Sequence, residues 1–324
     1  MKPVRRAVID VGTNSIKLLV ADVAGHDVRP VWEESKQTRL GRGFYETHRL
    51  QPEAIGSTAK AVAQFAAAAR KHGAVSVRVI ATSAARDALN AETLTSAIEE
   101  AAKLKVEIIS GEQEADWVFQ GVATDPQLAQ APLLLLDVGG GSTEFIVGQG
   151  EHKHFRQSFP LGTVRLMEKI PCSDPPHRAE LAACRKWVKE FLEEKVRPKV
   201  EPALRRETKT NPLPGTATQP EGVQLVGTGG TASILAAMEA KIDKYDRQRI
   251  EATRLRRERL HRHVEKLWGL PLAERKQIAG LPENRADVIL TGAAIYEAVM
   301  EEFDFSELRI STRGLRFAVV MDGA

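Results

Sequence analysis

The sequence predicts an α/β protein made of two related domains. Short apolar runs alternate with longer helical patterns, which is typical of sheets covered by helices. A strand–turn–strand unit occurs twice, about half a chain apart. The length of 324 residues also favours two domains over one. We therefore expect two related domains that face each other.

In the first half of the chain, each predicted element follows from a local pattern. Apolar runs at residues 4–9 and 16–23 indicate two strands joined by a turn. Pro52 begins an Ala-rich helix that runs to His72, before Gly73. The other expected elements are a strand at 75–81, a helix at 84–103, a strand at 106–109 and a helix at 112–122.

The second half repeats this alternation. The expected strands lie at 133–136, 144–147 and 223–226, and the expected helices lie at 231–241 and 285–303, the last of them long and amphipathic. Residues from about 202 to 222 are rich in turn formers and poor in apolar side chains. We expect them to form an exposed loop inserted between a helix and a strand.

Composition and charge exclude several classes of protein. With 43% hydrophobic residues the chain is not a disordered one, and it has no run of roughly 18 apolar residues that could span a membrane. Asp10 comes too early for the core of a signal peptide, so we expect a cytoplasmic protein. The net charge of +3 does not indicate a nucleic-acid binder. Cys172 and Cys184 lack zinc-ligand spacing and are expected to be reduced thiols.

The repeat is the most informative feature of the sequence. Residues 9–20 align without a gap with residues 136–147, and Asp, Val, Gly and Ser coincide. In each copy an Asp ends a strand, and small or hydroxyl residues follow. Backbone N–H groups in such a turn form an anion-binding concavity, and a carboxylate beside it suits Mg²⁺. The alternative is a tight hairpin that uses Gly for its turn. The hydroxyl donors available are those of Thr13, Ser15, Ser142 and Thr143.

Two further turns have the same chemistry. Gly229, Gly230 and Thr231 open a helix after a strand, which is a common place to bind phosphate, although a simple packing turn fits equally well. Arg86 lies in the first turn of its expected helix, where the helix dipole disfavours a cation. An anionic ligand would explain Arg86, and a surface ion pair is the alternative.

Two glutamates are candidates for acid–base chemistry. Glu114 lies in the first turn of a helix, and its spacing alone favours a role in stabilising that helix. Its place between the two repeats leaves it open as a general base beside bound phosphate. Glu144 follows the triple glycine, and the alternative for it is an outward-pointing strand residue.

Seven segments in this order resemble the exopolyphosphatase/guanosine-pentaphosphate phosphohydrolase (Ppx/GppA) family, in its short two-domain form. They are residues 9–15, 81–86, 110–115, 137–144, 227–231, 285–287 and 314–316. The resemblance runs from about residue 4 to residue 320. It implies the superfold shared by actin-like ATPases, sugar kinases and heat-shock chaperones, which consists of two ribonuclease-H-like domains with a cleft between them.

The resemblance also implies how the chain is divided. We expect an N-terminal ribonuclease-H-like domain at residues 1–116 that is completed by the final segment, 311–324. The second ribonuclease-H-like domain is expected at residues 117–310 and carries the inserted loop at about 202–222. Because the chain ends at Ala324, we expect it to lack the HD-like helical region of longer family members.

The implied activity is that of an exopolyphosphatase, a phosphoanhydride hydrolase that removes terminal orthophosphate processively from inorganic polyphosphate. By position, Glu114 matches the catalytic base, and Glu144 and Asp137 match the carboxylates that hold metal and water. We add Asp10 as a metal ligand through water. The implied phosphate-binding residues are Thr13, Asn14, Ser15, Lys17, Arg86, Gly140, Gly141, Ser142 and Thr143.

The implied cofactor is Mg²⁺, with Mn²⁺ as an alternative and a monovalent cation such as K⁺ left open. The implied partners are inorganic polyphosphate and guanosine penta- or tetraphosphate, with no nucleic acid and no membrane, and the family suggests a homodimer. Lys17 stands where the family commonly has Arg, so it keeps the charge but loses the bidentate fork. Phe317 and Ala318 replace a usual Glu-Gly pair near the C-terminus.

Three other functions stay open. The nearest is a guanosine pentaphosphate (pppGpp) 5′-phosphohydrolase, which no motif distinguishes from an exopolyphosphatase. A sugar or acetate kinase of the same superfold would need an acceptor pocket with a catalytic Asp. A catalytically weak sensor that binds the alarmone or polyphosphate is the third, and the presence of Glu114 and Glu144 argues against it.

A basic stretch at residues 244–266 contains seven arginines and few acids. Apolar residues spaced along it suggest an amphipathic helix beneath the charges. One interpretation is a basic track that holds a polyanion. A solvated charged face is at least as good an explanation.

Overall fold

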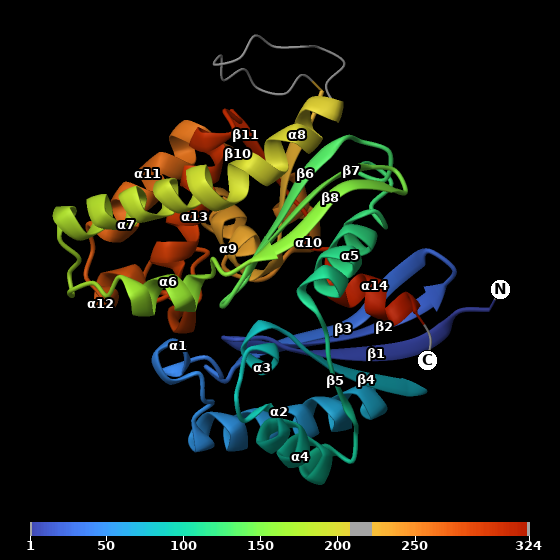
Figure 1. The fold of residues 1–324 in the computed structure, drawn as a ribbon. Helices are drawn as coiled ribbons and strands as arrows, with labels where there is room; N and C mark the ends of the chain where they lie inside the picture. The colour runs from blue at the N-terminus through green and yellow to red at the C-terminus, as the bar shows by residue number, and fades with distance from the viewer. Residues whose placement is uncertain (1, 208–221, 323–324) are drawn as a thin grey trace. The chain divides into compact units, whose positions relative to one another are not determined.

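The structure is a computed structural model that describes residues 2–207 and 222–322 (Figure 1). Contacts divide the chain into two compact units. Unit 1 consists of residues 1–125, 139–142 and 313–324, and unit 2 consists of residues 126–138 and 143–312. The domain boundaries expected from the sequence, near residues 116 and 311, stay a prediction. The description below follows the two units.

Unit 1 is built on a five-stranded sheet with the order β3-β2-β1-β4-β5. Strands β1 (Val4–Val11), β2 (Ser15–Ala24) and β3 (Asp27–Gln37) are antiparallel neighbours. Strands β4 (Ser76–Ala81) and β5 (Val106–Ile108) continue the sheet in parallel with β1. The central strands β1 and β2 are apolar on both faces, because helices cover both sides of the sheet.

Helices lie on both faces of this sheet (Figure 1). One face carries α2 (Pro52–Lys71), which packs against α4 (Ala91–Ala102). The other face carries α14 (Leu315–Met321), which packs on β1, β2 and α5 (Gly111–Val122). Two single-turn helices, α1 (Phe44–Thr47) and α3 (Ser83–Arg86), lie in loops that reach the site described below.

Unit 2 repeats the same topology with one extra strand, in the order β10-β11-β9-β6-β7-β8. Its strands are β6 (Leu133–Val138), β7 (Thr143–Gln149), β8 (His152–Phe159), β9 (Gln224–Thr228), β10 (Arg254–Arg256) and β11 (Glu307–Ile310). As in unit 1, three consecutive antiparallel strands are joined by parallel ones. The predicted α/β fold with two related ribonuclease-H-like sheets is therefore confirmed.

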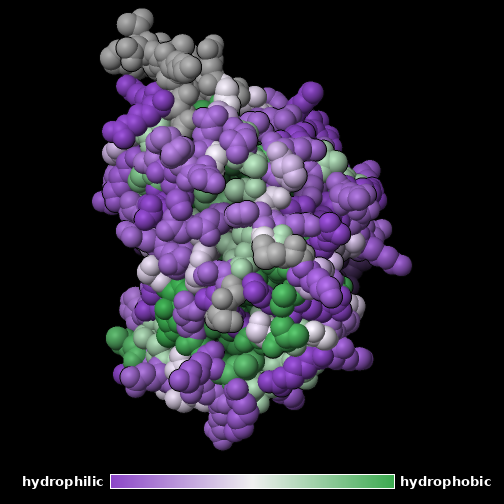
Figure 2. Space-filling view, turned by 90° about the vertical axis from the view of Figure 1, so that its right-hand side faces the viewer, coloured by the Kyte–Doolittle hydropathy of each residue, from purple (hydrophilic) through white to green (hydrophobic). Residues whose placement is uncertain are grey.

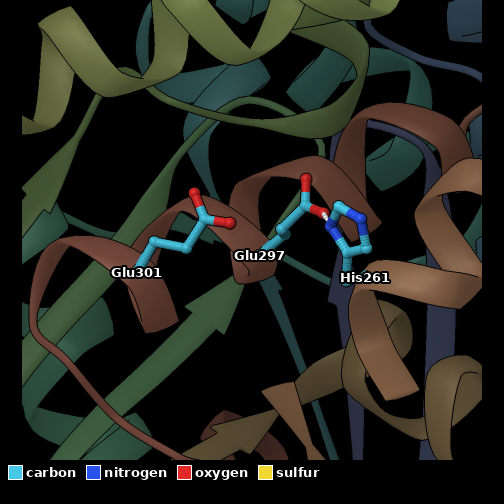
Figure 3. A group of neighbouring side chains, drawn as sticks. All are labelled: His261, Glu297 and Glu301. Atoms are coloured by element: carbon cyan, nitrogen blue, oxygen red, sulfur yellow. Dashed lines mark hydrogen bonds and ion pairs between the residues drawn. The ribbon is translucent and has the colours of Figure 1, made fainter. Parts of the chain in front are cut away.

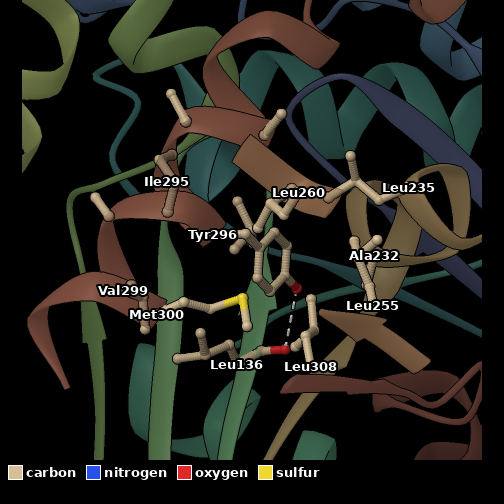
Figure 4. Close-up of a cluster of buried hydrophobic side chains, with 14 of the residues drawn as sticks. Leu136, Ala232, Leu235, Leu255, Leu260, Ile295, Tyr296, Val299, Met300 and Leu308 are labelled. Carbon is tan, nitrogen blue, oxygen red and sulfur yellow. Dashed lines mark hydrogen bonds between the residues drawn. The ribbon is translucent and has the colours of Figure 1, made fainter. Parts of the chain in front are cut away.

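The core of unit 2 surrounds α13 (Ile289–Glu302), on which every residue except Glu301 is buried. Tyr296 lies at its centre (Figure 4), and its hydroxyl group lies 3.3 Å from the carbonyl oxygen of Thr228. Burial raises the pKa of Tyr296 well above its usual value. The other helices of unit 2 are α6 (Thr163–Lys169), α7 (Arg178–Phe191), α8 (Arg197–Glu207), α9 (Gly229–Ala240), α10 (Arg247–Ala252), α11 (Arg257–Trp268) and α12 (Leu272–Arg275), with a π-helical turn at Leu192–Val196 and a 3₁₀ turn at Glu283–Arg285.

Two predicted helices differ from the structure. The helix expected at 84–103 is broken between α3 and α4, because the Asn90 side chain hydrogen-bonds both backbone groups of Leu50 and fixes the connection there. The helix expected at 285–303 begins only at Ile289. It is also buried all round rather than amphipathic, since other helices pack around it.

The exposed loop expected at about 202–222 begins later than predicted. Helix α8 continues through Pro202 to Glu207, because Val196, Val200 and Leu204 are buried at helical spacing and hold this segment against the core. The part of the expected loop at residues 208–221 lies outside the described residues.

Among the described residues, none of the helices combines the length and the apolar character needed to cross a bilayer. Figure 2 shows one face of the molecule, which is mostly hydrophilic, with hydrophobic side chains gathered in its lower half. One of the partly exposed apolar side chains is Trp32, whose ring stacks on that of His72 with 4.5 Å between the centroids.

Helices α5 and α14 cross at two glycines. A Cβ atom at Gly121 would collide with the backbone of Gly314, so the two helices are in contact through their backbones. Arg316 anchors α14 by donating from Nη1 to the carbonyl oxygen of Leu18 over 2.8 Å. The backbone approach at Gly121 is therefore a condition for docking the C-terminal segment.

We predict that Gly121→Ala lowers the free energy of unfolding by about 1–3 kcal/mol, because the added methyl group overpacks this crossing. Gly56→Ala is the matched control, since it lies in α2 with nothing within 4 Å of the added Cβ. The control should raise the stability by about 0.5–1 kcal/mol through helix propensity. Denaturant unfolding of both variants measures the two effects, and equal stabilisation by both would contradict the predicted crossing.

Candidate active site

The first repeated turn connects β1 to β2. The N–H of Gly12 donates to the carbonyl oxygen of Ser15 over 3.1 Å, which closes the turn. The carbonyl oxygen of Asn14 accepts two N–H groups from residues 38–39, over 3.2 and 3.0 Å. The segment after β3 is thereby fixed against the turn, and the turn is held in one conformation.

The second repeated turn, residues 139–142, connects β6 to β7 and is counted with unit 1, whose residues it contacts. The N–H of Gly139 donates to the carbonyl oxygen of Ser142 over 2.9 Å, which repeats the bond of the first turn. A Cβ atom at Gly140 would lie 2.9 Å from the Cβ of Thr13. The two glycine-rich turns are thus in direct contact.

Three hydroxyl groups converge on Gly141. A Cβ atom there would collide with Ser83 Oγ and with the Tyr45 hydroxyl, and it would lie 2.9 Å from Thr13 Oγ1. Ser83 begins the single-turn helix α3, and Tyr45 lies in α1. Since glycine carries no side chain, the hydroxyl groups from three separate loops can approach the same backbone.

Several buried polar atoms of unit 1 have no hydrogen-bond partner within the described part of the chain. They include Asn14 Nδ2, Ser15 Oγ and Ser83 Oγ. Buried donors are almost always hydrogen-bonded in native proteins, so each of these atoms calls for an acceptor from a ligand or from water. The other side of the Asn14 amide is occupied, because its Oδ1 accepts from Gln37 Nε2 over 3.1 Å. Phosphate oxygens are acceptors of the required kind.

Asp10 ends β1 directly before the first turn. It is buried, its Oδ1 has no partner among the described residues, and its partner across the strands is Lys17 on β2. Burial raises the pKa of the Asp10 carboxyl group, and the positive charges of Lys17 and Arg316 partly oppose this rise. In unit 1 the repeat therefore places the acidic side chain of Asp10 opposite the basic side chain of Lys17.

Arg86 and Glu114 form a partly buried ion pair in unit 1. Arg86 Nη1 donates to Glu114 Oε2 over 3.0 Å and to the carbonyl oxygen of Ile109 over 3.2 Å. Helix α5 holds Glu114 in its first turn, and the Ser110 side chain caps that turn by accepting from the N–H of Gln113. The structure thus brings together the candidate base and the candidate phosphate-binding arginine.

In unit 2, Asp137 and Glu144 are direct partners across the antiparallel strands β6 and β7. Such partners point to the same face of the sheet, with Cβ atoms about 4.5–5.5 Å apart. Glu144 is 1% exposed, and its Oε1 accepts from Ser158 Oγ over 2.7 Å. Like charges directly opposite each other repel, so this pair favours a bound cation. Unit 1 has Lys17 at the position of Glu144 and lacks this repulsion.

The turn before α9 lies against Asp137. Gly229 has a φ of 82°, and a Cβ atom there would collide with Asp137 Oδ1. Thr231 Oγ1 donates to the carbonyl oxygen of Val138 over 3.0 Å, and Thr143 Oγ1 donates to that of Leu161. The expected hydroxyl donors Thr143 and Thr231 therefore bind backbone carbonyl groups. These two hydroxyl protons are thus already used within unit 2.

The candidate residues fall into two sets. Those in unit 1 are Asp10, Thr13, Asn14, Ser15, Lys17, Arg86, Glu114, Gly140, Gly141 and Ser142, and those in unit 2 are Asp137, Thr143, Glu144, Gly229, Gly230 and Thr231. Within each set the structure gathers most of these residues around the repeated turns. Their chemical roles stay predictions.

Two residues near the candidates were missed by the sequence analysis. Tyr45 follows the glycines at 41 and 43, and these glycines were the one local signal that could have pointed to a functional loop. Its hydroxyl group reaches Gly141 only because of the way that loop folds. Ser158 binds Glu144 from the neighbouring strand β8, a strand that the sequence analysis did not predict. The first contact joins loops far apart in the sequence, and the second depends on the pairing of β7 with β8.

His261, Glu297 and Glu301 form a second group with ligand atoms suited to a metal, all within 4.8 Å of one another (Figure 3). Arg185 donates to both carboxylate oxygens of Glu297 over 2.8 Å, and His261 Nδ1 lies 2.8 Å from Oε1. Since Arg185 already occupies this carboxylate and would repel a cation, we interpret the group as an ion network that joins α7, α11 and α13.

Comparison with known proteins identifies the family of the chain. Residues 19–324 match the model of the Ppx/GppA phosphatase family. Exopolyphosphatase 2 of Mycobacterium tuberculosis is 37% identical over 311 residues, which cover 92% of this chain and 90% of that protein. Exopolyphosphatase 1 of Mycobacterium tuberculosis is 27% identical over 319 residues, which cover 98% of this chain and 87% of that protein.

Solved structures agree with this assignment. An exopolyphosphatase from Cytophaga hutchinsonii has a TM-score of 0.84 and 27% identity, with 99% of this chain and 98% of that chain covered. The Ppx/GppA family member of Aquifex aeolicus has a TM-score of 0.75 and 28% identity, with 99% and 97% covered. Both support the actin-like ATPase superfold of ribonuclease-H-like domains. The chain therefore belongs to the Ppx/GppA phosphatase family, whose members hydrolyse phosphoanhydride bonds.

Proposed function

We propose that the protein is an exopolyphosphatase that removes terminal orthophosphate from inorganic polyphosphate and does so processively. Family membership supports hydrolysis of polyphosphate or of pppGpp, and the similarity to Exopolyphosphatase 2 favours polyphosphate. The observation that carries the proposal is the set of buried donors without acceptors, Asn14 Nδ2, Ser15 Oγ and Ser83 Oγ, beside two glycine turns in contact. The proposal includes a cytoplasmic location and a homodimer, as expected from the sequence.

The unit 1 residues bind the terminal phosphates in this proposal. The donors of Asn14, Ser15 and Ser83 and the N–H groups of the turns replace the water lost by the phosphate oxygens. This is the main requirement of phosphoryl transfer, which depends on positioning and charge neutralisation. Arg86 exchanges its contact with Glu114 for a phosphate oxygen, and its planar guanidinium group suits that acceptor. Glu114 is then free to accept a proton from the attacking water.

Members of the family generally depend on a divalent metal, and we propose Mg²⁺ for this chain. The paired carboxylates of Asp137 and Glu144 fit such an ion because oxygen ligands suit Mg²⁺ and their mutual repulsion needs a counter-charge. The contact of Asp10 with the ion through water stays a prediction from the sequence, since Asp10 belongs to unit 1 and the carboxylate pair to unit 2. The bound ion would supply positive charge beside the phosphate oxygens, while Ser158 orients the Glu144 carboxylate.

We predict that Glu114→Gln lowers kcat for phosphate release from long-chain polyphosphate by about 10²–10⁴, because the amide cannot accept a proton. Glu112→Gln is the matched control, since Glu112 is exposed in the same helical turn. It should keep near wild-type activity. Circular dichroism checks that both variants fold, and near-normal release by folded Glu114→Gln would remove Glu114 as the base.

The carboxylate pair predicts a metal effect that is measurable without turnover. A hundredfold excess of Mg²⁺ over its dissociation constant should stabilise the wild type by about 2.7 kcal/mol, which raises its Tm. Without metal, the Tm of Glu144→Gln should be at least as high as that of the wild type, because the variant loses the repulsion from Asp137. With Mg²⁺, the Tm of this variant should not rise. Glu151→Gln, in the exposed turn before β8, is the control. An undiminished Mg²⁺ effect in Glu144→Gln would rule out this metal site.

The substrate is tested by phosphate release from polyphosphate of several lengths, from pppGpp and from ATP, with and without Mg²⁺. We expect polyphosphate to be hydrolysed fastest and to shorten without a ladder of intermediate chains, as processive removal requires. Faster release from pppGpp would replace the proposed substrate by the alarmone. Release from none of the three would favour a binding sensor.

A further inference from the structure

The basic stretch at residues 244–266 forms the expected amphipathic helix only in its last part, α11, where Leu260, Val264 and Leu267 are buried. It is divided among α10, β10 and α11, so its arginines point to different surroundings. Several are paired with acids, for example Arg257 with Asp304 over 2.8 Å and Arg247 with Glu251 over 3.6 Å. A continuous basic track along one helix is therefore wrong. The positions of the other lysines and arginines therefore follow from the tertiary structure and not from one shared helix.

Two of these cations, Arg262 and Lys266, gather with Lys241 at one pocket of unit 2. The pocket has a volume of about 260 Å³ and lies between the C-terminal end of α9, one face of α11 and the segment after α12. Lys241, Arg262 and Lys266 line it, and all three are exposed. Within the described part of the chain, Arg262 donates only to a carbonyl oxygen of its own helix, and the two lysines have no acidic partner. No acid of the described residues therefore neutralises these three charges beside the pocket.

The one acid of the pocket is already neutralised. Glu239 accepts from Arg259 Nε over 2.8 Å, and its other oxygen lies 2.7 Å from His263 Nε2. These hydrogen bonds outweigh the effect of burial and lower the pKa of Glu239, which keeps it ionised and paired. The lining thus has four Lys and Arg side chains against one carboxylate, which gives a formal charge of +3 with His263 neutral. Lys241 also offsets the negative end of the α9 dipole.

We propose that this pocket is a second anion site, which binds a diphosphate unit. The charge of +3 favours a ligand with several negative charges, and Arg262 offers the planar donors that phosphate oxygens accept. A volume of about 260 Å³ is large enough to hold a diphosphate group. The ligand is inorganic pyrophosphate, a segment of polyphosphate, or the diphosphate part of a nucleotide.

The site is separate from the proposed hydrolytic residues and does not depend on their role. Helix α9 begins at Gly229 beside Asp137 and ends at the pocket, so its 12 residues place about 18 Å of helix between the two sites. A ligand in the pocket contacts the opposite end of the helix that packs against the candidate metal ligand.

The test measures binding of pyrophosphate to the intact chain with divalent metal chelated, so that no hydrolysis occurs. The double variant Arg262→Gln/Lys266→Gln removes two pocket charges. The matched control Arg256→Gln/Lys244→Gln removes one arginine and one lysine of the same basic stretch that do not line the pocket. We expect titration calorimetry to show about ten- to a hundredfold weaker binding for the pocket variant and less than a twofold change for the control.

Hydrogen exchange gives the location of the ligand. Pyrophosphate should slow amide exchange at the end of α9 and along α11 in the wild type and the control, and not in the pocket variant. Slowed exchange confined to the turns of unit 1 would assign all binding to the proposed hydrolytic site and overturn the pocket. Equal weakening by both double variants would overturn it as well, because diffuse charge would then explain the binding.

The ligand source is resolved by comparing pyrophosphate, tripolyphosphate and ADP. Tighter binding of tripolyphosphate identifies an inorganic chain, and similar binding of all three identifies the diphosphate unit itself. Both results support the site. Binding of ADP without any binding of pyrophosphate would overturn the assignment, because the diphosphate unit alone should be sufficient.

Discussion

The close contact between two glycine-rich turns is the constraint on which the candidate site depends. At Gly140 and Gly141 any side chain would displace Thr13 or the hydroxyl groups of Ser83 and Tyr45. Because hydrogen is the only substituent there, three loops of unit 1 can approach one backbone segment. Their donors then lie together in a small volume, and several of them have no acceptor among the described residues. This geometry is what makes the region suited to phosphate.

The two copies of the repeat have kept their backbone and diverged in charge. Both turns close with the same N–H to carbonyl bond, and both sheets have three antiparallel strands followed by parallel ones. At the corresponding strand position, however, unit 1 has Lys17 opposite Asp10, while unit 2 has Glu144 opposite Asp137. The first pair combines opposite charges, and the second combines two acids, which is why we propose a cation there. The architecture is thus duplicated, and the paired carboxylates that we propose for the metal occur in one copy only among the two turns.

Local sequence was sufficient where short-range physics decides the structure. The strands beside both turns and the helix beginning at Pro52 follow from apolar pattern and backbone preferences. The same reasoning failed at Asn90, whose bonds to Leu50 break a helix, and at α13, whose burial depends on its neighbours. Edge strand β8 was also missed, because its exposed alternate residues give a weak apolar pattern.

The sequence by itself therefore determined the repeated turns, the two-sheet α/β architecture and the family, since these depend on residue identity and local spacing. Only the tertiary structure decided which side chains meet. In unit 1 it pairs Arg86 with Glu114 and places the Tyr45 hydroxyl group beside Gly141. In unit 2 the hydroxyl groups of Thr143 and Thr231 donate to backbone carbonyl groups. Three cations without an acidic partner among the described residues line one pocket of the same unit. The physical reason is that a side chain's partners are set by distances between loops and helices far apart in the chain, which spacing along the sequence does not encode.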